Sequence, residues 1–238
     1  MTETCGVIAL PNPAVAPSKG CAGWVPPEVD VRIGDGSLAI GEAGEIHIRS
    51  EVCFKGYLNS DEKPMDAQGW LASGDLGYMD EAGRLYITGR SKDVIIRGGH
   101  NIDPLAIEAC LEKHPAVNLA AAVGKPDAYA GELPVAYVQL NDGYTVSEAE
   151  LVDFARDNIN ERPACPKQIF IIGALPVTAV GKVHKPSLRE SAVQHVIEES
   201  LTQAFPECKV NVSAEIAKCG TTFIDISTSS STHVQPAE

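Results

Sequence analysis

Residues 84–104 read RLYITGRSKDVIIRGGHNIDP, and in this stretch the chain changes character. Its first part, Arg84–Thr88, alternates polar and apolar side chains with a period of two, which is typical of a half-buried strand. Its last two residues, Asp103 and Pro104, combine an N-cap side chain with a proline at the first helical position, which predicts the start of a helix. The stretch therefore joins a part built from short strands to a part that also contains helices.

Two more strand patterns precede this junction. Residues 29–33 and 45–49 alternate in the same way, and Asp80–Gly83 has the composition of a hairpin turn. Apart from the short stretch 60–65, no helical period of useful length occurs in this half. We predict that residues 24–90 form a small, mainly β unit.

Helices and strands are mixed after the junction. The helix that starts at Asp103-Pro104 carries an apolar stripe and is expected to end at Pro115. A capping box, Ser147 with Glu150, opens a second helix, and Pro186 opens a third. Strands are expected between these helices, near residues 93–97, 118–123, 134–140 and 168–172.

These patterns predict the fold class α+β. A small mainly-β subdomain occupies residues 1–90, and a compact α+β domain occupies residues 91–205. Residues 206–238 form an extension with one or two strand patterns up to residue 226. Because Ser227–Glu238 is rich in Ser and Thr, we expect it to be a frayed tail.

Composition excludes several classes of protein. With 238 residues, of which 44% are hydrophobic, the chain has enough apolar material for a sizeable core. Its 19 basic and 32 acidic residues give a net charge of −13, so it lacks the attraction to nucleic acid and anionic lipid that a basic surface provides. No apolar run reaches the roughly 18 residues of a membrane helix. The seven cysteines form no C-x-x-C pair, which argues against a disulfide framework and a zinc site and favours a cytoplasmic location.

Two segments of the β half carry candidate functional groups. Thr2-Glu3 offers a hydroxyl and a carboxylate, and Ser73–Gly77 places Asp75 between two glycines. A carboxylate with bare backbone on both sides can approach a ligand closely and accept two hydroxyl hydrogen bonds. The alternative interpretation of the second segment is a simple turn.

Two segments of the α+β half are also candidates. Residues 89–102 contain the glycine turn Gly98-Gly99, which can equally be an ordinary hairpin turn beside a solvated charge run. Residues 176–185 place Lys182 after a flexible glycine. A mobile ammonium there suits a transferring phosphate as a point charge, and the alternative is a solvated loop lysine.

In this order and spacing, the four segments resemble the AMP-forming acyl-CoA synthetases of the adenylate-forming superfamily. The resemblance covers roughly residues 1–205. It rests on TE at 2–3, SGDLGYMDEAGRLYITGRSKDVIIRGGHNI at 73–102 and LPVTAVGKVHK at 175–185. It implies the last β subdomain of the large AMP-binding domain, followed by the mobile C-terminal lid domain. The implied branch is that of fatty or aryl acyl-CoA ligases, and so fatty acid metabolism.

The resemblance implies a reaction in two steps. A carboxylic acid first attacks the α-phosphate of Mg²⁺-bound ATP and forms an acyl-adenylate and pyrophosphate. The thiol of coenzyme A then attacks the acyl carbon and releases AMP. The implied partners are ATP, coenzyme A and a carboxylic acid, with Mg²⁺ as cofactor.

Motif matching assigns roles at the nucleotide to four residues. Glu3 would bind Mg²⁺ and Thr2 would contact phosphate. Asp75 would hold the ribose hydroxyls with the help of Arg90.

Motif matching also assigns roles to four residues of the lid region. Lys182 would bridge the carboxylate and the α-phosphate in the first step. Lys92 would be the hinge. Gly98 and Gly99 would line the entry for pantetheine in the second step.

The glycine/serine-rich phosphate loop, the adenine site and the acyl pocket of the family have no counterpart in the sequence. We therefore expect the chain to be the C-terminal fragment of a ligase, to lack the large domain upstream, and to be inactive by itself. Two alternatives stay open: a lid module without activity that complements a separate large domain, and an adenylation domain that loads a carrier protein. The identity of the acid and the oligomeric state are not predicted.

Overall fold

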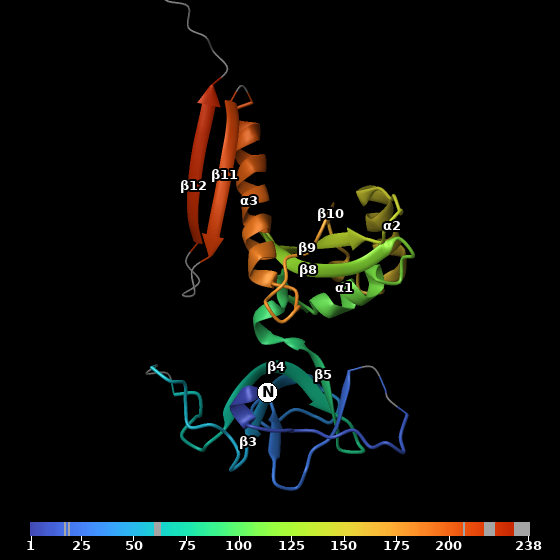
Figure 1. The fold of residues 1–238 in the computed structure, drawn as a ribbon, viewed down its shortest axis with the longest axis vertical. Coiled ribbons are helices and arrows are strands. Elements are labelled where there is room, and N and C mark those ends of the chain that lie inside the picture. The colour runs from blue at the N-terminus through green and yellow to red at the C-terminus, as the bar shows by residue number, and fades with distance from the viewer. Residues whose placement is uncertain (17, 19, 60–62, 207, 217–221, 231–238) are drawn as a thin grey trace, which may run out of the picture. The chain divides into compact units, whose positions relative to one another are not determined.

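The computed structural model describes residues 1–238 except residues 17, 19, 60–62, 207, 217–221 and 231–238 (Figure 1). The chain divides into two units, Met1–Asp93 and Val94–Glu238. The α+β prediction is confirmed, because the first unit is built on strands and the second combines mixed sheets with three helices. Within the described residues, no helix is long and apolar enough to cross a membrane.

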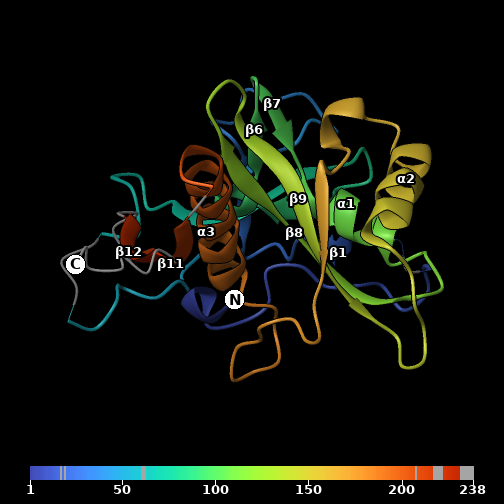
Figure 2. The same ribbon diagram turned by 90° about the horizontal axis from the view of Figure 1, so that it is seen from above.

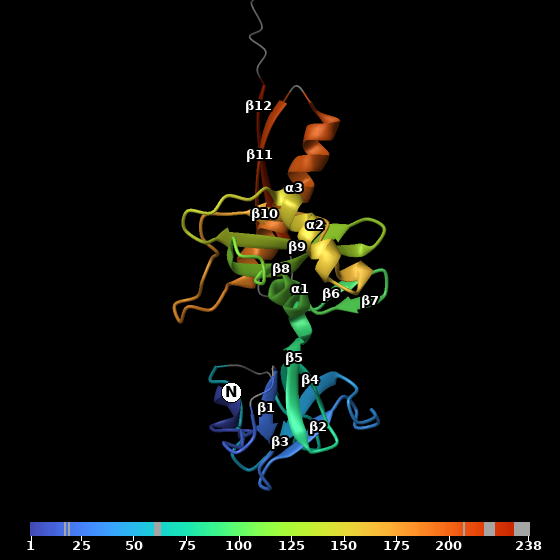
Figure 3. The ribbon, with the colours of Figure 1, turned by 90° about the vertical axis from the view of Figure 1, so that its right-hand side faces the viewer.

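The first unit is a five-stranded antiparallel sheet in the order β1-β5-β4-β3-β2 (Figure 3). Short 3-10 helices, η1 (Thr2–Thr4) and η2 (Ser91–Asp93), lie near its two ends in the sequence. The predicted strand patterns at 29–33, 45–49 and 84–88 fall on β2, β3 and β5. The strands are β1 (Cys21–Trp24), β2 (Asp30–Ile33), β3 (Gly44–Arg49), β4 (Leu71–Met79) and β5 (Arg84–Arg90).

The period of two explains how this sheet acquires a core. Ile46 and Ile48 lie two residues apart on β3, so both side chains point to the same face, and both are buried. They pack with Val29 and with Leu85 from β5. The expected helical stretch 60–65 is wrong in its described part: residues 63–65 are not helical, and Met65 forms a bridge with Leu71.

The second unit is centred on a long antiparallel pair, β8 (Val117–Asp127) and β9 (Gly131–Leu140). β10 (Gln168–Ile171) pairs in parallel with β9, and the hairpin of β6 (Ile95–Arg97) and β7 (His100–Ile102) is joined to β9 through Arg97 and Gly131. All four strands predicted in this region are present.

Helices cover both faces of the β8–β9 pair. Ile107 of α1 (Pro104–Leu111) and Leu151 of α2 (Glu148–Asn158) pack on one face, and Leu188 of α3 (Lys185–Ala204) packs on the other. Figure 2 shows α3 on one side of the strands and α1 and α2 on the other. The β8–β9 pair is therefore buried on both faces, which explains its nearly continuous apolar sequence.

The helix starts follow the predicted capping residues. Asp103 accepts a hydrogen bond from the backbone N–H of Leu105, and Ser147 accepts one from that of Glu150. The predicted end of the first helix at Pro115 is wrong, because α1 ends at Leu111. The chain leaves the helix there through further turns, with Lys113 and His114 donating backbone hydrogen bonds to Cys110 and Leu111.

An antiparallel hairpin follows the third helix. β11 (Cys208–Ile216) pairs along its length with β12 (Thr222–Ser230), and β11 runs beside α3 (Figures 1 and 3). The expectation of a frayed tail from Ser227 is therefore wrong for residues 227–230, which belong to β12. The remaining part of that tail, residues 231–238, lies outside the described residues.

The β4–β5 turn depends on one carboxylate. Asp80 accepts hydrogen bonds from the backbone N–H groups of Ala82 and Arg84, and its Oδ2 lies 2.6 Å from Arg84 Nε. The Arg84 backbone N–H contributes most to lowering the pKa of Asp80 below its ordinary value. Because the folded state favours the carboxylate, the stabilisation is present above the ordinary pKa and is lost as the pH falls through the lowered one.

We predict that Asp80→Ala lowers the unfolding temperature of the first unit at neutral pH. The difference from wild type should shrink as the pH falls from about 5 to about 2, because the native carboxylate is then protonated as well. Both tryptophans, Trp24 and Trp70, lie in this unit, so their fluorescence reports its unfolding. Glu81→Ala, which removes an exposed neighbouring carboxylate, is the control and should change little. A difference that does not depend on pH would contradict the prediction.

Gly77 is required by close packing of strands. A Cβ on this residue would overlap the carbonyl oxygen of Tyr86 on β5, and it would press on the side chain of Ile46. We predict that Gly77→Ala destabilises the first unit by about 1–3 kcal/mol, measured by urea unfolding with tryptophan fluorescence. Gly6→Ala, whose Cβ would meet only an ordinary contact, should stay within about 0.5 kcal/mol of wild type. Equal changes in stability for the two variants would contradict the prediction, because they would show that neighbouring atoms move and relieve the overlap.

Candidate functional site

The first candidate group is a carboxylate held across two strands. Asp75 of β4 lies directly opposite Arg90 of β5, and Arg90 Nε is 2.9 Å from Asp75 Oδ1. The side chain of Asp75 is 27% exposed, whereas that of Arg90 is 67% exposed. The pairing orients the carboxylate while part of it stays accessible to a ligand.

The backbone around Asp75 is shaped by its neighbours. Ser73 Oγ accepts a hydrogen bond from the Asp75 N–H, and Ser91 Oγ donates one to the Gly74 carbonyl. Gly74 has a φ of +71°, which a residue with a side chain rarely adopts, and apart from its chain neighbours no described residue has an atom within 4 Å of where its Cβ would be. The glycine is thus needed for the turn, and it leaves open space beside the carboxylate.

The second candidate group lies in η1. The backbone carbonyl of Glu3 accepts a hydrogen bond from Phe54 N–H, and its carboxylate Oε1 accepts one from the Tyr57 hydroxyl at 3.2 Å. Phe54 and Tyr57 contact each other edge to face, with centroids 4.8 Å apart. Thr2 is exposed beside Glu3. Sequence reasoning missed both aromatic residues, because they belong to no periodic pattern.

No hydrogen bond or ion pair joins Glu3 to Asp75 among the residues that the structure describes. The two groups therefore form separate clusters within the first unit. A single carboxylate such as Glu3 fits Mg²⁺, which is usually held by one or two protein carboxylates together with water and substrate phosphates.

The Gly98-Gly99 turn joins β6 to β7. Both glycines have positive φ angles, +54° and +85°, and a two-residue hairpin turn of this type requires them. The Gly98 N–H donates to the carbonyl of Ala130, so the turn lies beside the β8–β9 turn. Apart from the chain neighbours of each glycine, no described residue has an atom within 4 Å of either missing Cβ, so a side chain at either position would meet open space. The turn geometry by itself accounts for both glycines.

Lys182 lies near the tip of a closed loop between β10 and α3. Thr178 Oγ1 accepts a hydrogen bond from the Lys182 N–H, the Thr178 N–H donates to the Lys182 carbonyl, and the Gly181 N–H donates to the Thr178 carbonyl. A bridge between Val177 and Val183 closes the loop. The Lys182 side chain is exposed and makes no ion pair with any described residue. An ordered backbone thus presents an available cation.

Lys92 lies in the middle of η2, one residue before the division between the two units at Asp93. The first unit contains Thr2, Glu3, Asp75 and Arg90, and the second contains Gly98, Gly99 and Lys182. The candidates therefore fall into two groups on either side of this segment.

A largely buried ion pair joins the start of α3, directly after the Lys182 loop, to α1. Lys185 Nζ is 2.7 Å from Glu108 Oε1, and the two side chains are 14% and 12% exposed. Burial raises the pKa of the Glu108 carboxyl, and the Lys185 ammonium opposes this effect. Sequence reasoning missed this pair, because the two residues are far apart in the sequence.

The chain is similar to known proteins in sequence and in fold. Residues 106–182 match the family described as the AMP-binding enzyme C-terminal domain. Over 148 residues, the chain is 51% identical to the marinolic acid–CoA ligase of a Pseudoalteromonas species; the match covers 62% of this chain and 22% of the ligase.

The chain is also similar to solved structures of CoA synthetases. The o-succinylbenzoate CoA synthetase of Bacillus subtilis in complex with the acyl-adenylate intermediate has a TM-score of 0.72 and 35% identity, and the match covers 79% of this chain and 40% of the synthetase. The same synthetase in complex with ATP and magnesium has a TM-score of 0.68 and 35% identity, over 77% of this chain and 38% of the synthetase. In each comparison the chain spans less than half of the relative. Residues 106–182 thus match the AMP-binding enzyme C-terminal domain, and the chain is similar to CoA ligases over part of their length.

Proposed function

We propose that the chain acts as the C-terminal part of an ATP-dependent acyl-CoA ligase, called the complete ligase below. The complete ligase would also contain the phosphate loop, the adenine site and the acyl pocket that this sequence lacks. The observation that carries the proposal is the exposed Lys182 on its closed loop, inside a domain that matches the AMP-binding enzyme C-terminal family.

In the first step, an oxygen of the substrate carboxylate attacks the α-phosphorus of ATP. The bond between the α-phosphorus and the bridging oxygen breaks, and pyrophosphate leaves. Lys182 is proposed to bridge the attacking carboxylate and the α-phosphate, where negative charge concentrates in the transition state. Mg²⁺, bound with the help of Glu3, would neutralise phosphate charge.

The nucleotide would be held by residues of the first unit. We assign to Asp75 the ribose hydroxyls, because its carboxylate is partly exposed beside the open space at Gly74. Arg90 orients that carboxylate through the 2.9 Å ion pair. Thr2 is proposed to contact phosphate through its exposed hydroxyl.

In the second step, the sulfur of coenzyme A attacks the acyl carbon, the thiol proton is released, and AMP leaves. This step needs a passage for the pantetheine arm. We assign that passage to Gly98 and Gly99, because the space beside both residues is open.

The Gly98-Gly99 turn and the Lys182 loop cannot serve the same reaction site unless the second unit moves. The Gly98 turn is bonded to Ala130, next to the start of β9, whereas the Leu175 N–H at the base of the Lys182 loop donates to Gln139 near its end. The length of β9 places these two attachment points roughly 25–30 Å apart. A hinge at Lys92 would let the domain present first one loop and then the other.

The carrier-protein alternative differs in the acceptor of the acyl group, and the lid-module alternative predicts no catalysis. The proposed function therefore predicts that the complete ligase forms acyl-CoA, AMP and pyrophosphate, and that this requires coenzyme A. Neither alternative predicts this result. A role in fatty acid metabolism and a cytoplasmic location stay predictions.

We predict that Lys182→Ala in the complete ligase slows pyrophosphate release by roughly 10²–10³, because it removes one electrostatic contact to the transition state. The variant should still convert supplied acyl-adenylate to acyl-CoA at a near-normal rate, measured by the acyl-CoA formed. Lys113→Ala, which removes another exposed cation of the same unit, is the matched control and should leave both steps unchanged. Equal losses in both steps would contradict the assignment.

We also predict that Lys92→Pro in the complete ligase impairs one half-reaction and spares the other. Proline fixes φ near −65° and restricts the preceding residue, so it should trap one orientation of the domain. Lys92→Ala removes the charge but leaves the backbone free, and it should be mild in both steps. If proline spares both steps, or if alanine matches proline, the hinge lies elsewhere, at Ser91 or Asp93.

A further inference from the structure

The largely buried ion pair between Lys185 and Glu108 connects three elements of the second unit. Lys185 begins α3, Glu108 lies on α1, and Glu108 Oε1 also accepts a hydrogen bond from the backbone N–H of Ala122 on β8, at 2.9 Å. Both charged side chains are more than four-fifths buried. Since replacing a buried ion pair by apolar residues is often neutral or stabilising, stability alone does not explain the pair.

The position of Lys185 is also unfavourable for its own helix. The N-terminus of a helix carries partial positive charge, so a cation in the first turn is destabilising. The N-cap residue His184 provides no side-chain hydrogen bond to the helix backbone, and the first turn contains no acidic residue. The Glu108 carboxylate therefore supplies the negative charge that would otherwise come from a cap or a first-turn acid.

The loop is fastened at both of its ends. At its start, the Leu175 N–H donates to Gln139 Oε1 on β9. At its end, the His184 N–H donates to the Pro176 carbonyl, and the next residue, Lys185, reaches Glu108. Lys182 lies three residues before this second attachment, so a shift of the first turn of α3 would move it.

From this geometry we infer that Glu108 and Lys185 are positioning residues, which hold the end of the loop against α1 and β8 and so set the location of Lys182. The inference rests on the proposed function of Lys182 for its catalytic consequence, but the positioning itself can be tested without catalysis. The pair would act through Lys182 and would not contact the substrate.

The first experiment measures amide hydrogen exchange in the 238-residue chain itself. In Lys185→Met, the amides of Gly181, Lys182 and His184 should exchange at least about tenfold faster, while the Ile172 amide, which is bonded to Val138, changes little. Glu108→Gln keeps the size of the side chain and an acceptor for the Ala122 N–H, and it should show the same selective loosening. Lys185→Arg keeps the charge and should restore wild-type exchange.

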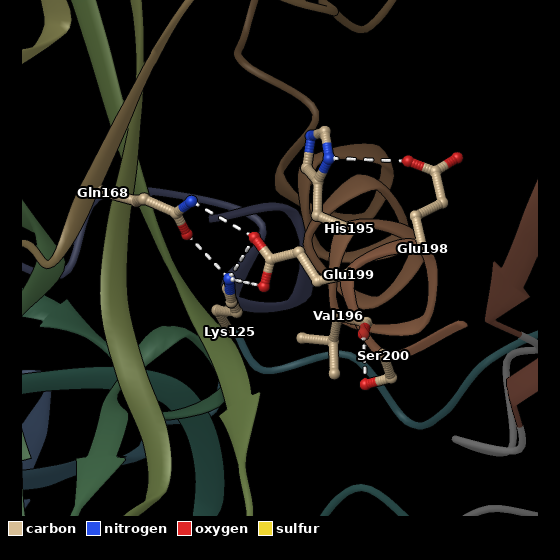
Figure 4. A network of polar contacts seen from close by, with 7 residues as sticks. All are labelled: Lys125, Gln168, His195, Val196, Glu198, Glu199 and Ser200. Atoms are coloured by element: carbon tan, nitrogen blue, oxygen red, sulfur yellow. Dashed lines mark hydrogen bonds and ion pairs between the residues drawn. The ribbon is translucent and has the colours of Figure 1, made fainter. Parts of the chain in front are cut away.

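A second ion pair of the same helix provides the matched control. Lys125 of β8 is 11% exposed, and its Nζ lies 2.8 Å from Glu199 Oε2 on α3 and 2.7 Å from Gln168 Oε1 (Figure 4). Lys125→Met removes this pair and leaves the loop attachments intact, so exchange in the loop should match wild type. Unchanged loop exchange in Lys185→Met, or equal acceleration of the loop and the Ile172 amide, would overturn the inference.

The second experiment measures both half-reactions in the complete ligase. Lys185→Met should slow pyrophosphate release at least about tenfold while acyl-CoA formation from supplied adenylate stays within about twofold of wild type. Lys185→Arg should restore pyrophosphate release. Lys182→Ala is measured in parallel, and it shows whether a negative result contradicts the positioning inference or the proposed function of Lys182. If Lys182→Ala is impaired and Lys185→Met is not, the positioning inference is wrong; if neither is impaired, the proposed function of Lys182 is wrong.

Discussion

The second unit depends on the antiparallel pairing of β8 with β9. Along this pair, alternate side chains enter two separate cores: Ala122 and Val138 belong to the core beneath α1 and α2, and Ala121 and Tyr137 to the core beneath α3. A shift of the register by one residue would exchange the two sets. The small alanines and the single large Tyr137 would then meet the wrong helices, so the register also determines where each helix packs.

Both candidate loops of the second unit derive their positions from the same strand pair. β10 pairs in parallel with β9, and the Lys182 loop leaves from its end. The β6–β7 hairpin joins the other end of β9 through Arg97 and Gly131. The separation of the two loops within the second unit is therefore a consequence of strand pairing.

The charged pairs of the two units differ in their burial. Asp75 and Arg90 form a partly exposed pair, which suits a carboxylate that must exchange water for a ligand. Glu108 and Lys185 are buried and hydrogen-bonded, which suits groups that must stay in place. Lys182 has neither kind of partner among the described residues, and so its charge is available to a substrate.

Local patterns in the sequence determined much of the fold. The period of two marked β2, β3 and β5, and the side chains of Asp103 and Ser147 marked the helix starts, because these signals depend on neighbours within a few residues. The motif segments were sufficient to indicate a resemblance to acyl-CoA ligases, and the chain is similar to such ligases over part of their length. The roles of the single site residues stay predictions.

Only the tertiary structure decided features that join distant parts of the chain. The ion pair between Glu108 and Lys185, the overlap that excludes a side chain at Gly77, and the hydrogen bond from Tyr57 to Glu3 all link residues from separate elements. The Ser/Thr-rich segment from Ser227 resembled a frayed tail, yet residues 227–230 pair with β11. The physical reason is the same in each case: a local pattern specifies backbone conformation, whereas a contact also requires a partner that the fold brings near.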